Sequence, residues 1–420
     1  MSELDQRDGL MDPITPTKGP AKVAKLIKIN SNEGPSAPDK HPIPKSQQRV
    51  VVKRTKAVII DLGTGYLKAG FAGQPGPSCV IPSAEGVTRR RSDVAGFSRR
   101  ESFVGKELLQ RPDLEWTAPL QHGIVTDWEA VERLWEYVFQ QELQVPFEEH
   151  AVLVSDPPLS PTTNREKFAE LMFETFSIPA IHIAYQSVLS VYSYGRTTGI
   201  VLESGHGCSY AVPIHDGYHM PSHTGRVDYG GQSLDAYLLS MLQDSGKTIP
   251  DNLHSIVEDI KKKCCYISLD TDHEMSLDKN DCAVDYELPD GHLISIGKER
   301  FACPEALFQP IALGSREPGL QTMVMNCINK CDIQIKKDLL KNIVVCGGST
   351  MFPGFPERLQ YELDKIAPRS EAAVVAVPER NYAVWRGGSI LASLQAFQSL
   401  WVRKEEYEER GPFIIYRKCF

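Results

Sequence analysis

The chain has 420 residues, 41% of them hydrophobic, which is enough for at least two cores because a single core stops growing well below this length. Residues 1–56 hold eleven Lys and Arg against six Asp and Glu, whereas the whole chain has a formal net charge of −8, so the remainder is acidic. No stretch approaches the roughly 18 apolar residues of a membrane-spanning helix, so we expect no transmembrane segment and at most a peripheral membrane contact.

Residues 1–54 contain seven prolines and no Phe, Trp or Tyr, so they cannot bury enough surface to offset the entropy of ordering. We expect a disordered basic extension there. After it, strands and amphipathic helices alternate, which predicts an α/β architecture. A helix is expected over "DWEAVERLWEYVFQQELQV" with Asp127 as its N-cap, then a buried strand in "EEHAVLVSDPPLSP" and a second helix in "NREKFAELMFETF".

Three glycine-rich turns follow buried strands, and two of them repeat one pattern. Asp61-Leu62-Gly63-Thr64-Gly65 ends the first strand, and Glu203-Ser204-Gly205-His206-Gly207 ends a later one. A further strand follows each turn, so both are predicted to be hairpin tips rather than Rossmann-type strand-to-helix turns. The third turn, Cys346-Gly347-Gly348-Ser349-Thr350, precedes a helix that begins near Pro356.

Glycine lets the backbone of a hairpin tip bring its N–H groups within hydrogen-bonding distance of phosphate oxygens. Two facing tips could therefore clamp a polyphosphate, with the strand-end acids holding Mg²⁺ through water. The third turn could let a flat base approach the backbone. Each turn could equally be an ordinary structural turn, and both interpretations stay open at this point.

These turns, in this order, form the nucleotide-clamp pattern shared by actin, the seventy-kilodalton heat-shock proteins and the sugar kinases. The rest of the chain, from about residue 56 to residue 420, resembles actin in "LKAGFAG", "HGIVTDWE", "GRTTGIVLESG", "YELPDG", "ERFACPEALFQP", "CGGSTMFPGF", "GGSILASLQAFQ" and "YRKCF". "HAVLVSDPPLSP", "DIKKKCCY" and the histidine of the second tip look most like the mammalian germ-cell actin-like proteins, the seven and nine group.

The resemblance implies an actin-like fold of two lobes, each of two subdomains, around a nucleotide cleft. The first lobe would span residues 55–190, with helices of residues 385–420 returning to it, and the second would span residues 191–384. The cofactor would be ATP or ADP with Mg²⁺.

Matching positions assign roles in this implied cleft. Phosphate contacts would come from Gly63, Thr64, Gly65, Lys68, Ser204, Gly205 and Gly207. Lys261, Gly348 and Met351 would flank the nucleoside. Asp61 would hold the metal through water, Gln186 would position the attacking water, and Glu203 and His206 would complete the catalytic set. His122 matches the histidine that is methylated in actin.

Several of these positions depart from actin. Leu62 stands where actin has Asn, and Glu203 and His206 stand where it has Asp. Tyr210 replaces a His of actin, Lys262 replaces a Glu, and Asn381 replaces a Lys. Attack of water on a γ-phosphate depends on positioning and electrostatics, so losing the groups that hold this water should slow hydrolysis by orders of magnitude. A neutral His206 could still hydrogen-bond a phosphate. We therefore predict that ATP binding is retained at a degenerate ATPase site with weak or no hydrolysis; the alternative is a cleft closed by side chains.

Two surfaces are candidates for partner binding. The loop "VTRRRSDVAGFSRRESFVG" matches in length the loop that inserts into the next subunit of an actin filament, but residues 89–100 hold five arginines, whose hydration and repulsion disfavour burial. An acidic partner or an anionic surface suits this basic loop better, and a solvated loop is the other interpretation. The groove that receives partner helices in actin corresponds to Tyr192, Gly195, Thr197, Arg386, Ile390, Leu391 and Leu394, where Arg386 replaces an apolar residue and should change partner choice.

The sequence thus predicts an actin-like cytoskeletal scaffold of the spermatid head or acrosome during sperm development, with protein partners that could include other actin-like proteins. The germ-cell assignment rests on the resemblance alone. The scattered cysteines favour a reducing compartment, the cytoplasm or the nucleus. The resemblance implies the cytoskeleton, including the perinuclear or acrosomal region of sperm. The alternatives are an ATP-hydrolysing, filament-forming actin and a nuclear actin-related subunit of a chromatin complex. No sequence-specific nucleic-acid binding is expected.

Overall fold

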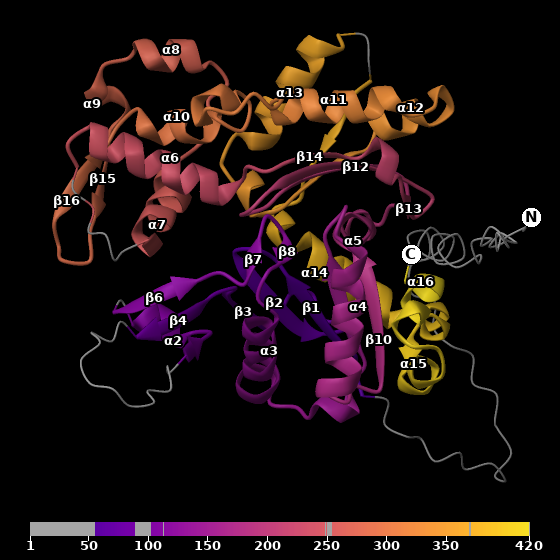
Figure 1. The fold of residues 1–420 in the computed structure, drawn as a ribbon. Helices are drawn as coiled ribbons and strands as arrows, with labels where there is room; N and C mark the ends of the chain where they lie inside the picture. Colours follow the sequence, from indigo (N-terminus) through magenta and orange to yellow (C-terminus); the bar gives the residue numbers. More distant parts are fainter. Residues whose placement is uncertain are drawn as a thin grey trace, which may run out of the picture.

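The computed structural model describes residues 55–88, 102–111, 113–247, 249, 254–368 and 371–419. The predicted N-terminal extension and the basic loop of residues 89–100 lie outside the described residues. Within them, helices and strands alternate and form two α/β lobes, one above the other in Figure 1, which confirms the predicted fold class. No helix in this part of the chain is both long and apolar enough to cross a bilayer.

The lower lobe in Figure 1 is built on a mixed sheet. Its strands pair in the order β19 (Val402–Arg403), β10 (Ala180–Tyr185), β9 (Val152–Asp156), β1 (Val58–Leu62), β2 (Tyr66–Phe71) and β3 (Cys79–Pro82). β1, β9 and β10 run parallel, and β1 and β2 form an antiparallel hairpin. All residues of β1 and β9 are buried, as expected for parallel strands that are covered on both faces.

Amphipathic helices cover this sheet where the sequence predicted them. α3 (Trp128–Tyr137) is capped by Asp127, whose carboxylate accepts a hydrogen bond from the Ala130 amide at 3.0 Å, and it continues as a π-helical segment to Leu143. α4 (Thr162–Glu170) packs beside it through stacking of Trp135 on Phe168, 5.6 Å between centroids. The smaller elements of the lobe are α2 (Glu107–Gln110), β4 (Glu85–Thr88), β5 (Ser102–Val104), β6 (Leu114–Thr117), β7 (Leu120–Gln121) and β8 (Ile124–Val125).

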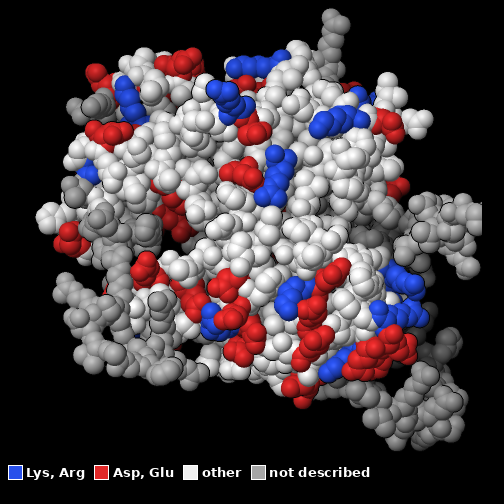
Figure 2. Space-filling view, in the orientation of Figure 1, with Lys and Arg blue, Asp and Glu red and all other residues white. Residues whose placement is uncertain are grey.

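The C-terminal segment returns to the lower lobe. β19 extends the sheet by pairing with β10, and α15 (Lys404–Arg410) and α16 (Ile415–Lys418) follow it. α16 contacts α4 and β10. Figure 2 shows Asp and Glu gathered on the face of this lobe that carries α3 and α4, with Lys and Arg interspersed.

The upper lobe contains the second sheet. Its strands pair in the order β13 (Tyr218–His219), β12 (Ser209–His215), β11 (Gly199–Ser204), β17 (Ile343–Cys346) and β18 (Val374–Val375), with β14 (Gly225–Val227) also on β12. The other elements of this lobe are α6 (Gly231–Asp244), α7 (His254–Cys264), α8 (Thr271–Ser276), α9 (Lys279–Cys282), β15 (Val284–Glu287), β16 (Leu293–Ile296), α10 (Glu299–Glu305), α11 (Leu320–Lys330), α12 (Ile333–Leu340) and α13 (Phe355–Ile366). Figure 1 shows α11, α12 and α13 on the outer side of the sheet.

Two helices lie between the sheets. α5 (Gln186–Ser193) and α14 (Ala383–Ser393) pack against each other and share one hydrophobic cluster with strands of both lobes. A Cβ added to Gly387 would lie 1.8 Å from the Leu189 carbonyl oxygen, so glycine permits this close helix contact. The expected lobe boundaries, at 190/191 and 384/385, fall inside these two helices.

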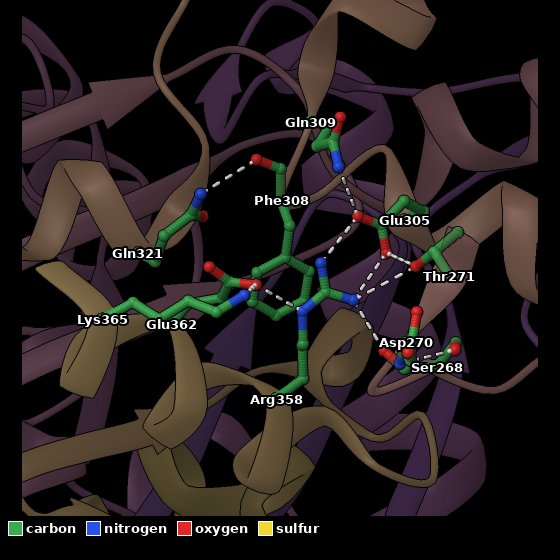
Figure 3. Close-up of polar contacts among 10 residues, drawn as sticks. All are labelled: Ser268, Asp270, Thr271, Glu305, Phe308, Gln309, Gln321, Arg358, Glu362 and Lys365. Atoms are coloured by element: carbon green, nitrogen blue, oxygen red, sulfur yellow. Dashed lines mark hydrogen bonds and ion pairs between the residues drawn. The ribbon is translucent and has the colours of Figure 1, made fainter. Parts of the chain in front are cut away.

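A buried ion pair joins α13 to α10 (Figure 3). The Arg358 guanidinium donates to both carboxylate oxygens of Glu305, at 2.8 and 2.9 Å, and to the Ser268 carbonyl at 2.6 Å. It also lies over the Phe308 ring, 5.1 Å from the centroid. This bidentate geometry fixes the orientation of both helices.

Candidate functional site

A cavity of about 550 Å³ lies between the two lobes. Most of the predicted nucleotide-site residues line it: Asp61, Gly63, Thr64, Gly65, Lys68, Gln186, Glu203, Gly205, His206, Gly207, Lys261, Gly348 and Met351. Ser204 is the exception, because its side chain is fully buried behind the hairpin and its Oγ lies 2.9 Å from the Oγ of Ser209. The strand-end turns of two separate sheets therefore meet at one concave site.

The two hairpin tips are in direct contact. A Cβ added to Gly65 would lie 2.8 Å from the Cβ of His206, and one added to Gly207 would lie 2.9 Å from the Thr64 side chain. Glycine is thus needed at both tips for their approach, as well as to leave backbone N–H groups accessible.

A third hairpin, β7–β8, holds the two tips together. His122 has a left-handed φ of 47°, and its Nδ1 lies 2.7 Å from the Gly207 carbonyl oxygen. The adjacent Gly123 amide donates to Thr64 Oγ1 at 2.9 Å. Sequence reasoning singled out His122 for its possible methylation and missed this bridging contact of its loop, since nothing local in the sequence connects residues so far apart.

Asp61 at the end of β1 is fully engaged. Its Oδ2 accepts from the Lys68 ammonium at 2.8 Å, and its Oδ1 accepts from Ser155 Oγ at 2.7 Å. Gln186 at the start of α5 donates to the same Ser155 Oγ at 3.3 Å. Ser155, at the end of β9, is a site residue that the sequence reasoning missed; its position at the carboxyl end of a parallel strand beside β1 was the available signal.

Glu203 is the carboxylate without a partner in this cavity. Its Oε2 is buried and has no hydrogen bond within the described residues. Burial, with the nearby Asp61 charge, raises the pKa of Glu203 to about 8, although Lys68 opposes this shift. The hydroxyl of its cross-strand neighbour Tyr210 is also buried and lacks a hydrogen-bond partner of good geometry among the described residues.

These oxygen atoms bear on whether a metal fits the site. Unpartnered buried oxygens cost free energy unless something satisfies them. Asp61 and Glu203 supply carboxylates, the type of ligand through which hydrated Mg²⁺ is usually held in proteins. No group of three or more His, Cys, Asp or Glu in the described residues is arranged to hold a metal directly. The residues present therefore fit a cation bound through water.

His206 is neutral near pH 7. Burial lowers its pKa to about 4, the charge of Lys261 adds to this effect, and Glu258 opposes it. The Lys261 ammonium is itself committed, because it donates to the Gly231 carbonyl at 2.9 Å and pairs with Asp235 at 2.8 Å. The second tip thus presents an uncharged ring to the cavity.

The third turn closes one wall of the cavity. Gly347 has a φ of 95°, and a Cβ there would lie 2.2 Å from the Ser204 carbonyl oxygen. Ser349 Oγ donates to the Gly205 carbonyl at 2.7 Å, which ties this turn to the second tip. Gly348 has open space where its Cβ would be, and Met351 is partly exposed beside it, so a flat group can approach the backbone here.

The residues of the predicted partner groove come together around α5 and α14, but they differ in exposure. Tyr192, Thr197 and Leu391 are buried, whereas Ile390 is 36% exposed. Gly195 is exposed and Leu394 is partly exposed. Arg386 forms an ion pair with Glu379, and its Nε donates to the Pro75 carbonyl at 3.2 Å. The accessible apolar surface is therefore narrower than the sequence suggested.

Comparison with known proteins bears on this geometry. The family model described as Actin matches residues 52–420. Actin-like protein 7A of Homo sapiens is 52% identical over 403 residues, which cover 96% of this chain and 92% of that relative. Actin-like protein 7A of Rattus norvegicus is 53% identical over 385 residues, 91% and 87% of the two chains. Actin-like protein 7B of Homo sapiens is 52% identical over 370 residues, 88% and 89%. The predicted resemblance is confirmed.

Proposed function

Because the chain belongs to the actin family, whose members generally bind a nucleotide with a divalent cation, we propose that its interlobe cavity binds ATP or ADP with Mg²⁺. One observation carries the proposal: the glycine tips of two separate hairpins meet at the cavity, with Lys68 beside the first. Their backbone N–H groups are suited to phosphate oxygens. We propose that Gln186, Asp61 and Glu203, which all line the cavity, hold the terminal phosphate and its hydrated cation, and that the nucleoside binds at the open backbone of Gly348.

The nucleotide content of the purified chain tests this binding. We expect denaturation to release close to one ATP or ADP per chain, identified by mass spectrometry. Chain with no released nucleotide and no saturable binding of a fluorescent ATP analogue in the presence of Mg²⁺ would refute the proposal, and the glycine turns would then serve only as elements of the fold.

We further propose that hydrolysis is weak. The rate depends on charges and dipoles that hold the attacking water. His206 is uncharged at neutral pH, and burial favours the protonated form of Glu203. We expect release of labelled γ-phosphate far slower than from actin measured beside it. His206→Asp should raise this rate, whereas His215→Asp, on the same strand pair but outside the cavity, should not. A parent rate equal to that of actin would contradict the proposal.

We propose that the molecule acts as a cytoskeletal scaffold in the sperm-forming cell, near the nucleus and acrosome. The support is family membership and similarity to actin-like proteins 7A and 7B. The proposed lobes, residues 55–190 with 385–420 and residues 191–384, have their support in the two separate sheets. Sedimentation in Mg²⁺ and salt tests the scaffold role: efficient, ATP-dependent pelleting would favour a filament-forming actin instead.

We also propose that the groove around α5 and α14 binds an amphipathic partner helix, with Arg386 selecting among partners. The support is the partly exposed apolar edge at Ile390 and Leu394, next to the Arg386–Glu379 ion pair. Arg386→Ile should change which helical peptides bind, measured by fluorescence anisotropy across a peptide panel. Identical binding by the parent and the variant would refute a role for Arg386.

A further inference from the structure

Three polar side chains meet across the cleft. Tyr66 comes from β2 in the lower lobe, and Glu258 and Lys262 come from adjacent turns of α7 in the upper lobe. The Tyr66 hydroxyl donates to the Glu258 carboxylate at 3.0 Å and accepts from the Lys262 ammonium at 3.0 Å. Lys262 also pairs with Glu258 at 2.7 Å and lies over the Tyr66 ring, 4.6 Å from its centroid.

All three residues line the interlobe cavity, so this contact forms part of its wall. The Lys262 side chain is 53% exposed, which places the contact at the edge of the cavity that faces solvent. Burial raises the pKa of Tyr66, with the charge of Glu258 adding to the shift, so the phenol keeps its proton and remains a donor. Because the hydrogen bonds join different lobes, the cleft cannot widen at this edge without breaking them.

α7 carries a second, matched trio that stays within one lobe. One residue further along the helix, Lys263 pairs with Asp259 at 2.7 Å, and Tyr286 of β15 hydrogen-bonds to that carboxylate. The Lys263 ammonium lies 5.8 Å from the Tyr286 centroid. Each trio combines a tyrosine with a carboxylate and a lysine four residues apart on α7, with Asp259 in the place of Glu258. The tyrosine of the first trio belongs to the opposite lobe, and that of the second belongs to the same lobe as α7.

We propose that Tyr66, Glu258 and Lys262 form a latch that holds the cleft closed and slows nucleotide exchange. The inference rests on the proposed nucleotide binding. It assigns a regulatory role to residues that neither clamp phosphate nor take part in hydrolysis. The latch holds the edge of the cavity, whereas the hairpin tips hold the phosphates.

The test is the release of a fluorescent ATP analogue, measured by chasing the loaded full chain with excess unlabelled ATP. Tyr66→Phe keeps the ring and removes the hydroxyl that links the lobes. Since hydrogen bonds to charged groups are the strong ones, we expect release to become about tenfold faster. Glu258→Gln should also accelerate release. The matched variants Tyr286→Phe and Asp259→Asn should leave the rate unchanged.

Hydrogen exchange of the nucleotide-free chain tests the latch separately. Tyr66→Phe should increase exchange of the amides near Tyr66 and in α7, whereas Tyr286→Phe should leave the amides near Tyr66 unchanged. If no nucleotide binds but the exchange difference is present, the proposed function fails while the interlobe latch stands. If nucleotide binds and both Tyr66→Phe and Glu258→Gln keep the parent release rate within twofold, the latch proposal is wrong.

Discussion

Replacing Glu203 by Gln should stabilise the nucleotide-free protein at neutral pH. The pKa of Glu203 in the folded chain is raised to about 8 from 4.5, so folding favours its protonated form. A group with a raised folded pKa contributes its full stability below the unfolded pKa and loses it as pH rises through the folded pKa. The loss therefore begins near pH 4.5 and continues to about pH 8. Glutamine mimics the neutral carboxyl group, so the Glu203→Gln variant avoids this loss of stability.

The magnitude follows from the shift. Each pH unit in this window corresponds to about 1.4 kcal/mol, so at pH 7 the upper bound is about 3 kcal/mol. Glu203 is partly accessible to solvent, which screens its charge, so we expect Glu203→Gln to gain roughly 1–2 kcal/mol in the free energy of unfolding. The gain should shrink towards zero as the pH approaches 5.

Denaturant unfolding of nucleotide-free protein, in EDTA, from pH 5 to pH 8 measures this difference. Glu129→Gln is the control, because its side chain is 88% exposed and its ion pair is long, at 3.8 Å. Glu203→Gln should also weaken the gain in nucleotide affinity on adding Mg²⁺ by about tenfold, since a charge-assisted hydrogen bond to the water of the cation is lost. A variant less stable than the parent at pH 7, or a gain that does not depend on pH, would refute the assigned environment of Glu203.

Three further predictions concern the fold and the hairpin tips. Burial lowers the pKa of His182 to about 3, so below pH 6.5 the unfolded chain takes up a proton that the folded chain does not. Between pH 7.5 and pH 5 the free energy of unfolding, measured with denaturant, should therefore change less favourably in the parent than in His182→Leu, by about 2 kcal/mol. Arg358→Met should lower the free energy of unfolding by about 3–5 kcal/mol, measured by calorimetry, because Glu305 is left buried without its partner. The double variant with Glu305→Leu should recover part of this loss, because no buried charge is then unpaired. Gly65→Ala should weaken nucleotide binding, because the new methyl group meets the His206 side chain and pushes the tips apart. Adding His206→Gly removes that side chain and should restore the affinity. Titration with a fluorescent ATP analogue measures both effects.

Local patterns predicted the elements that hold the site. The helix at Asp127 and the hairpin tips at Gly63 and Gly205 follow from capping and turn chemistry, and the structure has them at the expected positions. The contact between the tips did not follow from the sequence. It requires that Gly65 meets His206, and this depends on how the two sheets pack around α5 and α14.

The direction in which side chains point was also not predicted correctly from the sequence. Ser204 matches Leu62 in the repeated pattern, and Thr64 matches His206. Ser204 was expected to contact phosphate, yet it points into the hairpin towards Ser209, whereas Thr64 lines the cavity. Ser204 is the last residue of β11, and alternation along a strand places its side chain on the face opposite to that of Glu203, which lines the cavity. Similarly, the spacing of Glu258 and Lys262 predicts a helix-surface ion pair but not its tyrosine partner in the other lobe.

The charges of the cavity decide what it can bind. Asp61 is paired with Lys68, Lys261 with Asp235, and Glu258 with Lys262. His206 is neutral, and burial favours the neutral form of Glu203 as well. The cavity therefore has little free positive charge to balance a triphosphate, and the backbone dipoles of the tips supply only partial charges. Binding of ATP without a divalent cation should accordingly be weak. Mg²⁺ should both neutralise the phosphate charges and favour the ionised form of the Glu203 carboxyl group.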